Sequence, residues 1–138
     1  MSDTGVPRTM RAIQVRDGKG PSSNLYLDDK TPVPSLQDHG HDHHDTAAQR
    51  ILVKVHAFGL NRMDILQREG LYPLPPGASA ILGVEFSGTV ADKGTSDWRV
   101  GQEVFGLATG GAYAENIAGG CEAGRGRVCA AQRALHPL

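Results

Sequence analysis

The sequence of 138 residues predicts a small, mainly β domain, a β-barrel with one or two short helices. Three observations lead to this fold class. Eighteen glycines and eight prolines indicate many turns and few long helices. Several short segments alternate apolar and polar residues, which is the pattern of half-buried strands. A single segment carries the start and stop signals of a short helix instead.

The first predicted elements form a hairpin near the N-terminus. We expect residues 1–9 to be a disordered leader. Residues 10–15 are a short strand candidate, and a cluster of Asp, Gly and Pro follows as a turn. Residues 25–27 are the expected return strand, after which Pro32 and Pro34 restrict the chain to a sheet edge or a linker.

The segment 37–49 is rich in histidine and aspartate. Its histidines are His39, His41, His43 and His44. Neutral imidazoles at this density can bind zinc, nickel or copper. A site of fixed geometry also needs a rigid frame and supporting partners, which a run of Gly and Asp does not provide. We therefore expect a solvated loop with only adventitious affinity for metals.

A strand and a helix are predicted between residues 51 and 70. The residues that share the inner face of the strand are Ile51, Val53, Val55 and Ala57. Asn61 is a good N-cap, because its side-chain oxygen can accept from the backbone N–H of Asp64. Asp64 also lies in the first turn, where the helix dipole favours an anion. Gly70 is the expected stop, and the inner side of the helix is assigned to Met63, Ile65 and Leu66.

Three more strands are expected after a loop. Residues 71–77 contain three prolines and cannot form regular structure. Residues 84–90 alternate apolar and polar side chains, and residues 103–107 and 113–117 follow as shorter strands. The last twenty residues, 119–138, are biased toward Gly, Ala, Arg and Cys, and we expect them to be an unrelated, disordered tail.

Composition excludes several classes of function. A net charge of −1 gives no electrostatic case for binding nucleic acid or an anionic membrane. The sequence has no apolar run of about eighteen residues that could span a bilayer. Its start also lacks the apolar core of a secretory signal, so the cytoplasm is the expected location. The two cysteines, Cys121 and Cys129, do not form a disulfide framework.

Three stretches of sequence carry a family resemblance. They are LNRMDILQREGLYPLPPGAS, ILGVEFSGTV and VGQEVFGLATGGAYAENIA. In this order they resemble the GroES-like first domain of the medium-chain dehydrogenase/reductase family, and within it the NADPH-dependent quinone oxidoreductases of the zeta-crystallin type. The resemblance covers residues 10–118, apart from the insertion at 37–49. It implies a GroES-like β-barrel, truncated before the Rossmann domain that would hold the cofactor.

The resemblance also bears on zinc. The zinc-dependent alcohol dehydrogenases of this family have Cys at the position of Asn61 and His at the position of Val84. An amide and an isopropyl group cannot replace a thiolate and an imidazole as zinc ligands. The domain is therefore expected to belong to the zinc-free reductases.

In quinone reductases of this type, a hydride passes from NADPH to a quinone, and the cofactor supplies the difficult chemistry. The resemblance implies that Asn61 lies near the nicotinamide ribose or the substrate, and that Tyr72 stacks on the ring or hydrogen-bonds to it. Asn61 can also be explained as a helix cap alone, and Tyr72 as an aromatic at the rim. The residues that would distinguish NADPH from NADH are expected in the Rossmann domain.

Three functions remain open at this stage. The first is the substrate-side domain of a quinone oxidoreductase, with no tightly bound cofactor and no activity of its own. The second is a non-catalytic module, such as a decoy that dimerises with a full-length reductase. The third, a co-chaperonin, would need a mobile apolar loop, whereas the long loop here is rich in His and Asp.

Overall fold

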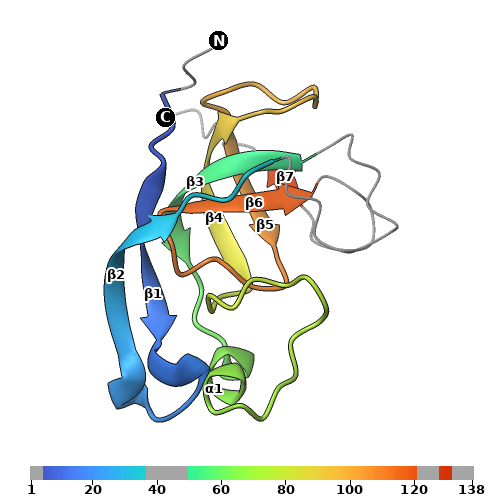
Figure 1. The fold of residues 1–138 in the computed structure, drawn as a ribbon. Helices are drawn as coiled ribbons and strands as arrows, with labels where there is room; N and C mark the ends of the chain where they lie inside the picture. Colours follow the sequence, from blue (N-terminus) through green and yellow to red (C-terminus); the bar gives the residue numbers. More distant parts are fainter. Residues whose placement is uncertain (1–4, 37–49, 121–127, 132–138) are drawn as a thin grey trace, which may run out of the picture.

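The structure, a computed structural model, describes residues 5–36, 50–120 and 128–131. Within them the chain forms two antiparallel sheets (Figure 1). The smaller sheet is a hairpin of β1 (Thr9–Val15) and β2 (Leu25–Pro32). Two single turns of 3-10 helix connect its strands, η1 (Arg16–Gly18) and η2 (Ser22–Asn24). The hairpin predicted from the sequence is confirmed, and β2 is longer than expected.

The larger sheet contains five strands in the order β6-β3-β4-β5-β7. They are β3 (Arg50–Phe58), β4 (Glu85–Asp92), β5 (Glu103–Leu107), β6 (Asn116–Gly120) and β7 (Val128–Ala130). The sheet is curled, and the helix α1 (Arg62–Arg68) lies below it in Figure 1, near the turn of the hairpin. The mainly β fold class with a short helix is therefore confirmed.

The core follows the alternation that the sequence predicts for β4. Phe86, Gly88 and Val90 are buried, whereas their neighbours along the strand are half-buried. The buried apolar residues packed together inside the large sheet are Ile51, Val53, Phe86, Val90, Val104, Ala112, Ile117 and Val128. Burial of such side chains is the main stabilising contribution in a domain of this size.

The predicted inner face of β3 is correct only for its first half. Ile51 and Val53 are fully buried and Val55 is half-buried, but Ala57 is exposed. The pairing of β3 with β4 shifts register between Val55 and Ala57. Because side chains alternate with a period of two, one extra residue turns the rest of the strand to the opposite face.

The helix begins and ends where the sequence predicts. Asn61 and Asp64 form a capping box, and Gly70 ends the helix with a φ of 77°. The predicted inner side is wrong at Ile65, which is 46% exposed, since the helix buries Asp64 and Gln67 instead. The buried side of this short helix is polar because Asp64 meets a hydrogen-bonding partner from the segment before β6, described below.

The expected boundary at residue 118 differs from the structure. β6 continues to Gly120, and Val128–Ala130 pair with β5 as an edge strand. The prediction of an unrelated, disordered tail is therefore wrong for these residues, because the side chain of Val128 belongs to the core of the large sheet. The composition of the tail did not indicate this three-residue strand, because its partner strand lies more than twenty residues earlier in the sequence.

The two sheets are joined along residues 113–115, which were predicted to begin the last strand. Ala114 makes an isolated bridge to Ala12 of β1, and the backbone N–H of Ile13 donates to the carbonyl oxygen of Tyr113 at 2.8 Å. Glu115 accepts three hydrogen bonds from Arg11, from its backbone N–H at 2.9 Å and from its guanidinium at 2.8 and 2.7 Å. The last strand starts later than expected because these residues pair with the hairpin.

Glu115→Gln is expected to remove a contribution to folding stability that is present at neutral pH and lost in acid. The backbone N–H and then the side chain of Arg11 lower the pKa of Glu115. A lowered pKa adds stability above the ordinary Glu value of about 4.3, and this stability is lost as the pH falls through the lowered pKa. Thermal melting from pH 7 to pH 3 should show a lower Tm for the variant at pH 7 and converging curves in acid. A constant difference at every pH would contradict this assignment.

Several predictions fall on residues outside the described ranges. These are residues 1–4 of the leader predicted at 1–9, the histidine-rich loop with its four candidate ligands, and Cys121. The prediction of a disordered leader is wrong at Thr9, which begins β1 and pairs with Pro32. Cys129 lies in β7 as an exposed free thiol. Among the described residues, no helix has both the length and the hydropathy needed to cross a bilayer.

Candidate functional site

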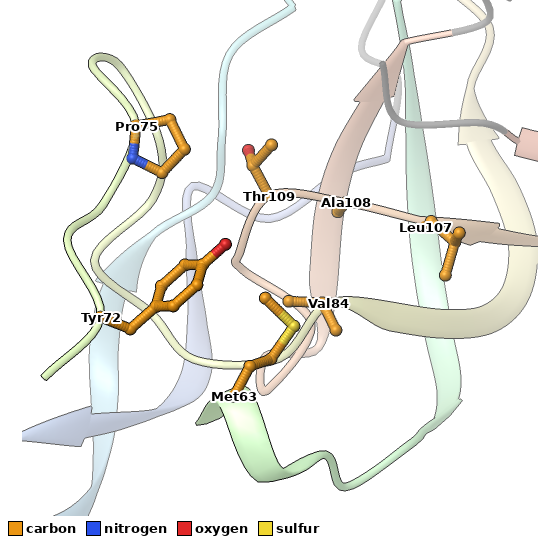
Figure 2. Close-up of a pocket in the computed structure, with 7 residues that line it drawn as sticks. All are labelled: Met63, Tyr72, Pro75, Val84, Leu107, Ala108 and Thr109. Atoms are coloured by element: carbon orange, nitrogen blue, oxygen red, sulfur yellow. The ribbon is translucent and has the colours of Figure 1, made fainter. Parts of the chain in front are cut away.

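An open hollow of about 290 Å³ lies between the helix, the proline-rich loop and the end of β5. Its lining residues are Met63, Tyr72, Pro75, Val84, Leu107, Ala108 and Thr109. Figure 2 shows Met63 and Val84 at its floor and the Tyr72 ring at its side, with the phenol oxygen turned inward. The hollow is mostly apolar, and the hydroxyls of Tyr72 and Thr109 are its polar groups. We call this cavity the hollow.

One wall of the hollow is fixed by backbone hydrogen bonds between two segments without regular structure. Ala108 N–H donates to the carbonyl oxygen of Val84 at 2.7 Å, and Ala112 N–H donates to that of Gly83 at 3.1 Å. Tyr113 N–H donates to the carbonyl oxygen of Leu82 at 2.9 Å. These bonds extend the pairing of β4 and β5 beyond the sheet, so Val84 and Ala108 are held rigidly side by side.

The other wall begins at the N-terminus of α1, where a buried polar network lies. The Asp64 carboxylate is only 3% exposed. Its Oδ2 accepts from the backbone N–H of Asn61 at 2.8 Å and from the hydroxyl of Tyr113 at 2.8 Å. Burial, and then the bond to Asp64, raise the pKa of Tyr113, so this hydroxyl stays protonated at neutral pH.

Two buried polar atoms of this network have no hydrogen-bond partner among the described residues. They are Nδ2 of Asn61 and Oδ1 of Asp64. A buried donor without a partner costs free energy, so such groups are often found where a ligand or a water completes the site. Nδ2 of Asn61 is thus a buried donor whose hydrogen bond is not used among the described residues.

The structure places the two predicted site residues differently. Tyr72 lines the hollow and is 39% exposed. Asn61 caps the helix two residues before Met63, and it is not one of the seven lining residues. The roles of both residues toward a substrate stay predictions. Tyr113, which connects the helix to the sheet, was missed, because nothing in its local sequence distinguishes it from an ordinary strand aromatic.

The position that would carry the zinc-binding histidine in the zinc branch holds Val84, whose side chain forms part of the apolar floor (Figure 2). Across the described ranges, no three His, Cys, Asp or Glu side chains gather in a way that could hold a metal ion. The chemistry of the hollow is thus that of an apolar slot with hydroxyl groups at its side.

Comparison with known proteins agrees with the fold. Residues 47–135 match the family described as the alcohol dehydrogenase GroES-like domain. The chain therefore belongs to this family, within the medium-chain dehydrogenase/reductases. The quinone oxidoreductases of Rattus norvegicus and Lama guanicoe are each 32% identical over 111 residues. Each alignment covers 78% of this chain, and the chain spans 30% of the length of either relative.

Solved structures show the same relationship. The quinone oxidoreductase from Coxiella burnetii is 26% identical with a TM-score of 0.68, covering 93% of this chain and 38% of that chain. The human synaptic vesicle membrane protein VAT-1 homolog-like protein is 28% identical with a TM-score of 0.71. This match covers 93% of this chain and 37% of that chain. The resemblance to the quinone oxidoreductase branch is therefore confirmed.

Proposed function

We propose that this domain forms the substrate side of a quinone-reducing site and that the hollow receives the quinone ring. The observation that carries the proposal is an apolar slot in which the hydroxyls of Tyr72 and Thr109 provide the polar groups. A quinone has the complementary form, a flat apolar ring with two carbonyl oxygens that accept hydrogen bonds. The names of the relatives support the same substrate class.

The size of the hollow suits a small aromatic ligand. Binding sites for small molecules have volumes of about 300 Å³ and more, so about 290 Å³ is enough for one ring system. Met63 and Val84 would exclude water from the face of the ring. The Tyr72 hydroxyl would donate to a quinone oxygen, where negative charge develops on reduction. Asn61 is proposed to donate from Nδ2 to the ligand or to the cofactor ribose.

NADPH, when bound by the whole protein, would supply the hydride. None of the seven lining residues is cationic, so the hollow offers no charged group to a pyrophosphate. We therefore expect the dinucleotide to be held mainly by protein outside the described residues and to bind this chain weakly by itself. The proposed location is the cytoplasm, and association with a longer reductase is the proposed partnership.

Tyr72→Ala is expected to weaken quinone binding about tenfold, because the aromatic face that contacts the ring and one hydroxyl are lost together. The measurement is a titration of the 138-residue chain with duroquinone, followed by NMR shifts of Met63 and Val84. The affinity of Tyr72→Phe for duroquinone should fall two- to threefold, since only the hydroxyl is removed. The same titration with NADPH is expected to show no saturation at micromolar concentrations.

The matched control is Leu74→Ala, which alters an exposed apolar residue of the same loop outside the lining of the hollow. This variant should bind duroquinone like the unaltered chain. Equal affinity of Tyr72→Ala and the unaltered chain would contradict the proposed place of the ring.

A further inference from the structure

We propose that Tyr113 is a positioning residue of the quinone site, acting through Asp64 to hold the Asn61 amide and Met63 against the wall formed by Val84 and Ala108. The inference rests on the proposed function, because it assigns a role to a residue that does not line the hollow. It is carried by the hydrogen bonds and the packing around the Tyr113 side chain.

Two donors from distant parts of the chain converge on one carboxylate oxygen. The Tyr113 hydroxyl and the Asn61 backbone N–H each lie 2.8 Å from Oδ2 of Asp64. The hydroxyl comes from a residue 49 positions away in sequence, whereas the N–H belongs to the helix cap itself. The carboxylate is thus shared by the helix and the sheet, and its position is determined by both.

The ring of Tyr113 cannot easily move. It packs against Phe58, with ring centroids 4.5 Å apart and planes tilted by 32°. On another side it lies so close to Gly83 that a Cβ at this glycine would overlap the ring. Its backbone is hydrogen-bonded in both directions, to Leu82 and to Ile13. The hydroxyl is therefore presented to Asp64 from a rigid support.

The residues on either side of this network belong to opposite walls of the hollow. Met63 directly precedes Asp64, and Val84 directly follows Gly83, which touches the Tyr113 ring. The bond from Tyr113 to Asp64 joins the two walls. Just before the helix, the backbone N–H of Gly59 also donates to the carbonyl oxygen of Glu85, at a longer distance of 3.3 Å. Without the hydroxyl, Oδ2 keeps one donor and Oδ1 has none, so the start of the helix loses its bond to the segment before β6.

Loss of this link affects the unpartnered Nδ2 of Asn61 most directly. That atom is buried and belongs to the residue whose N–H shares Oδ2 with Tyr113. A shift of the helix start by a fraction of an ångström moves the amide and Met63 together, and misplacement on this scale is enough to weaken binding. The hydroxyl of Tyr113 thus acts on the ligand without touching it.

Tyr113→Phe tests the role, because it keeps the ring and removes the hydroxyl. We expect the affinity for duroquinone, measured well below the Tm, to fall about fivefold, and the side-chain amide protons of Asn61 to change chemical shift even without quinone. A purely structural hydroxyl would lower the Tm and leave both the affinity and these protons unchanged, which would overturn the proposal. Tyr26→Phe, the same change on an exposed tyrosine of β2, is the control and should alter neither.

A second measurement on the unaltered chain covers the case in which Tyr113→Phe does not fold. The Tyr113 hydroxyl proton should exchange slowly and should shift together with the Asn61 amide on addition of duroquinone. If Met63 and Val84 respond to quinone but Tyr113 and Asn61 do not, the inference is wrong and the proposed function stands. If no residue responds to quinone, the proposed function is wrong, and with it the role assigned to Tyr113.

Discussion

Gly88→Ala is expected to lower the free energy of unfolding by about 3 kcal/mol or more, which a small domain can scarcely tolerate. Gly88 is buried in β4, opposite Val55 and beside the register shift of β3. A Cβ at this position would overlap the backbone carbonyl oxygen of Lys54. Because a backbone atom cannot rotate away as a side chain can, the two central strands would have to separate.

Gly120→Ala is the matched control for this effect. Gly120 also lies in a strand, at the end of β6, but no atom of the described part of the chain lies within 4 Å of a Cβ placed there. Urea unfolding followed by tryptophan fluorescence should give Gly120→Ala a midpoint close to that of the unaltered chain. Equal stability of the two variants would mean that β3 and β4 do not approach as closely as described.

Asp64→Ala is expected to cost about 2–4 kcal/mol of folding stability, since two donors lose their shared acceptor. The donors are the Tyr113 hydroxyl and the Asn61 N–H, and the carboxylate lies in a buried site. The helix cap and the bond to Tyr113 are therefore lost in a single substitution. Thermal and urea unfolding of the variant provide the measurement.

Two further variants show whether this loss arises from the hydrogen bonds. Asp64→Asn keeps one acceptor oxygen and should cost less than Asp64→Ala. Asp29→Ala removes an exposed carboxylate of β2 and should change the stability by less than about 0.5 kcal/mol. A loss for Asp29→Ala as large as for Asp64→Ala would point to a general effect of charge.

The features that the sequence predicts correctly are local ones. The alternation from residue 84 to 90 indicates a strand with Gly88 inward, and the three-residue spacing of Asn61 and Asp64 indicates a cap. Each pattern is complete within a few residues, so neighbouring side chains suffice to read it. The motif around Asn61 and Tyr72 also leads to the family, which no single strand or helix could do.

The features that were missed depend on contacts between distant residues. Ala57 turns outward because of a register shift against β4, and Ile65 because the helix faces Tyr113 with its polar side. The strand at Val128–Ala130 exists only as a partner of β5. The local sequence around a small apolar residue or a single tyrosine does not show that such a partner exists. The hollow could not be predicted for the same reason, because four separate segments of the chain form it.

The order of the strands also has a consequence for how the chain acquires its fold during synthesis. β3 and β4 are neighbours in sequence, so they can pair soon after residue 92 has been made. The other edge of β3 is paired by β6, which is completed only at Gly120. Until then a strand rich in valine and isoleucine has an open edge, and pairing of such distant segments is slow. Chaperone contact on a nascent chain is therefore expected to concentrate on β3.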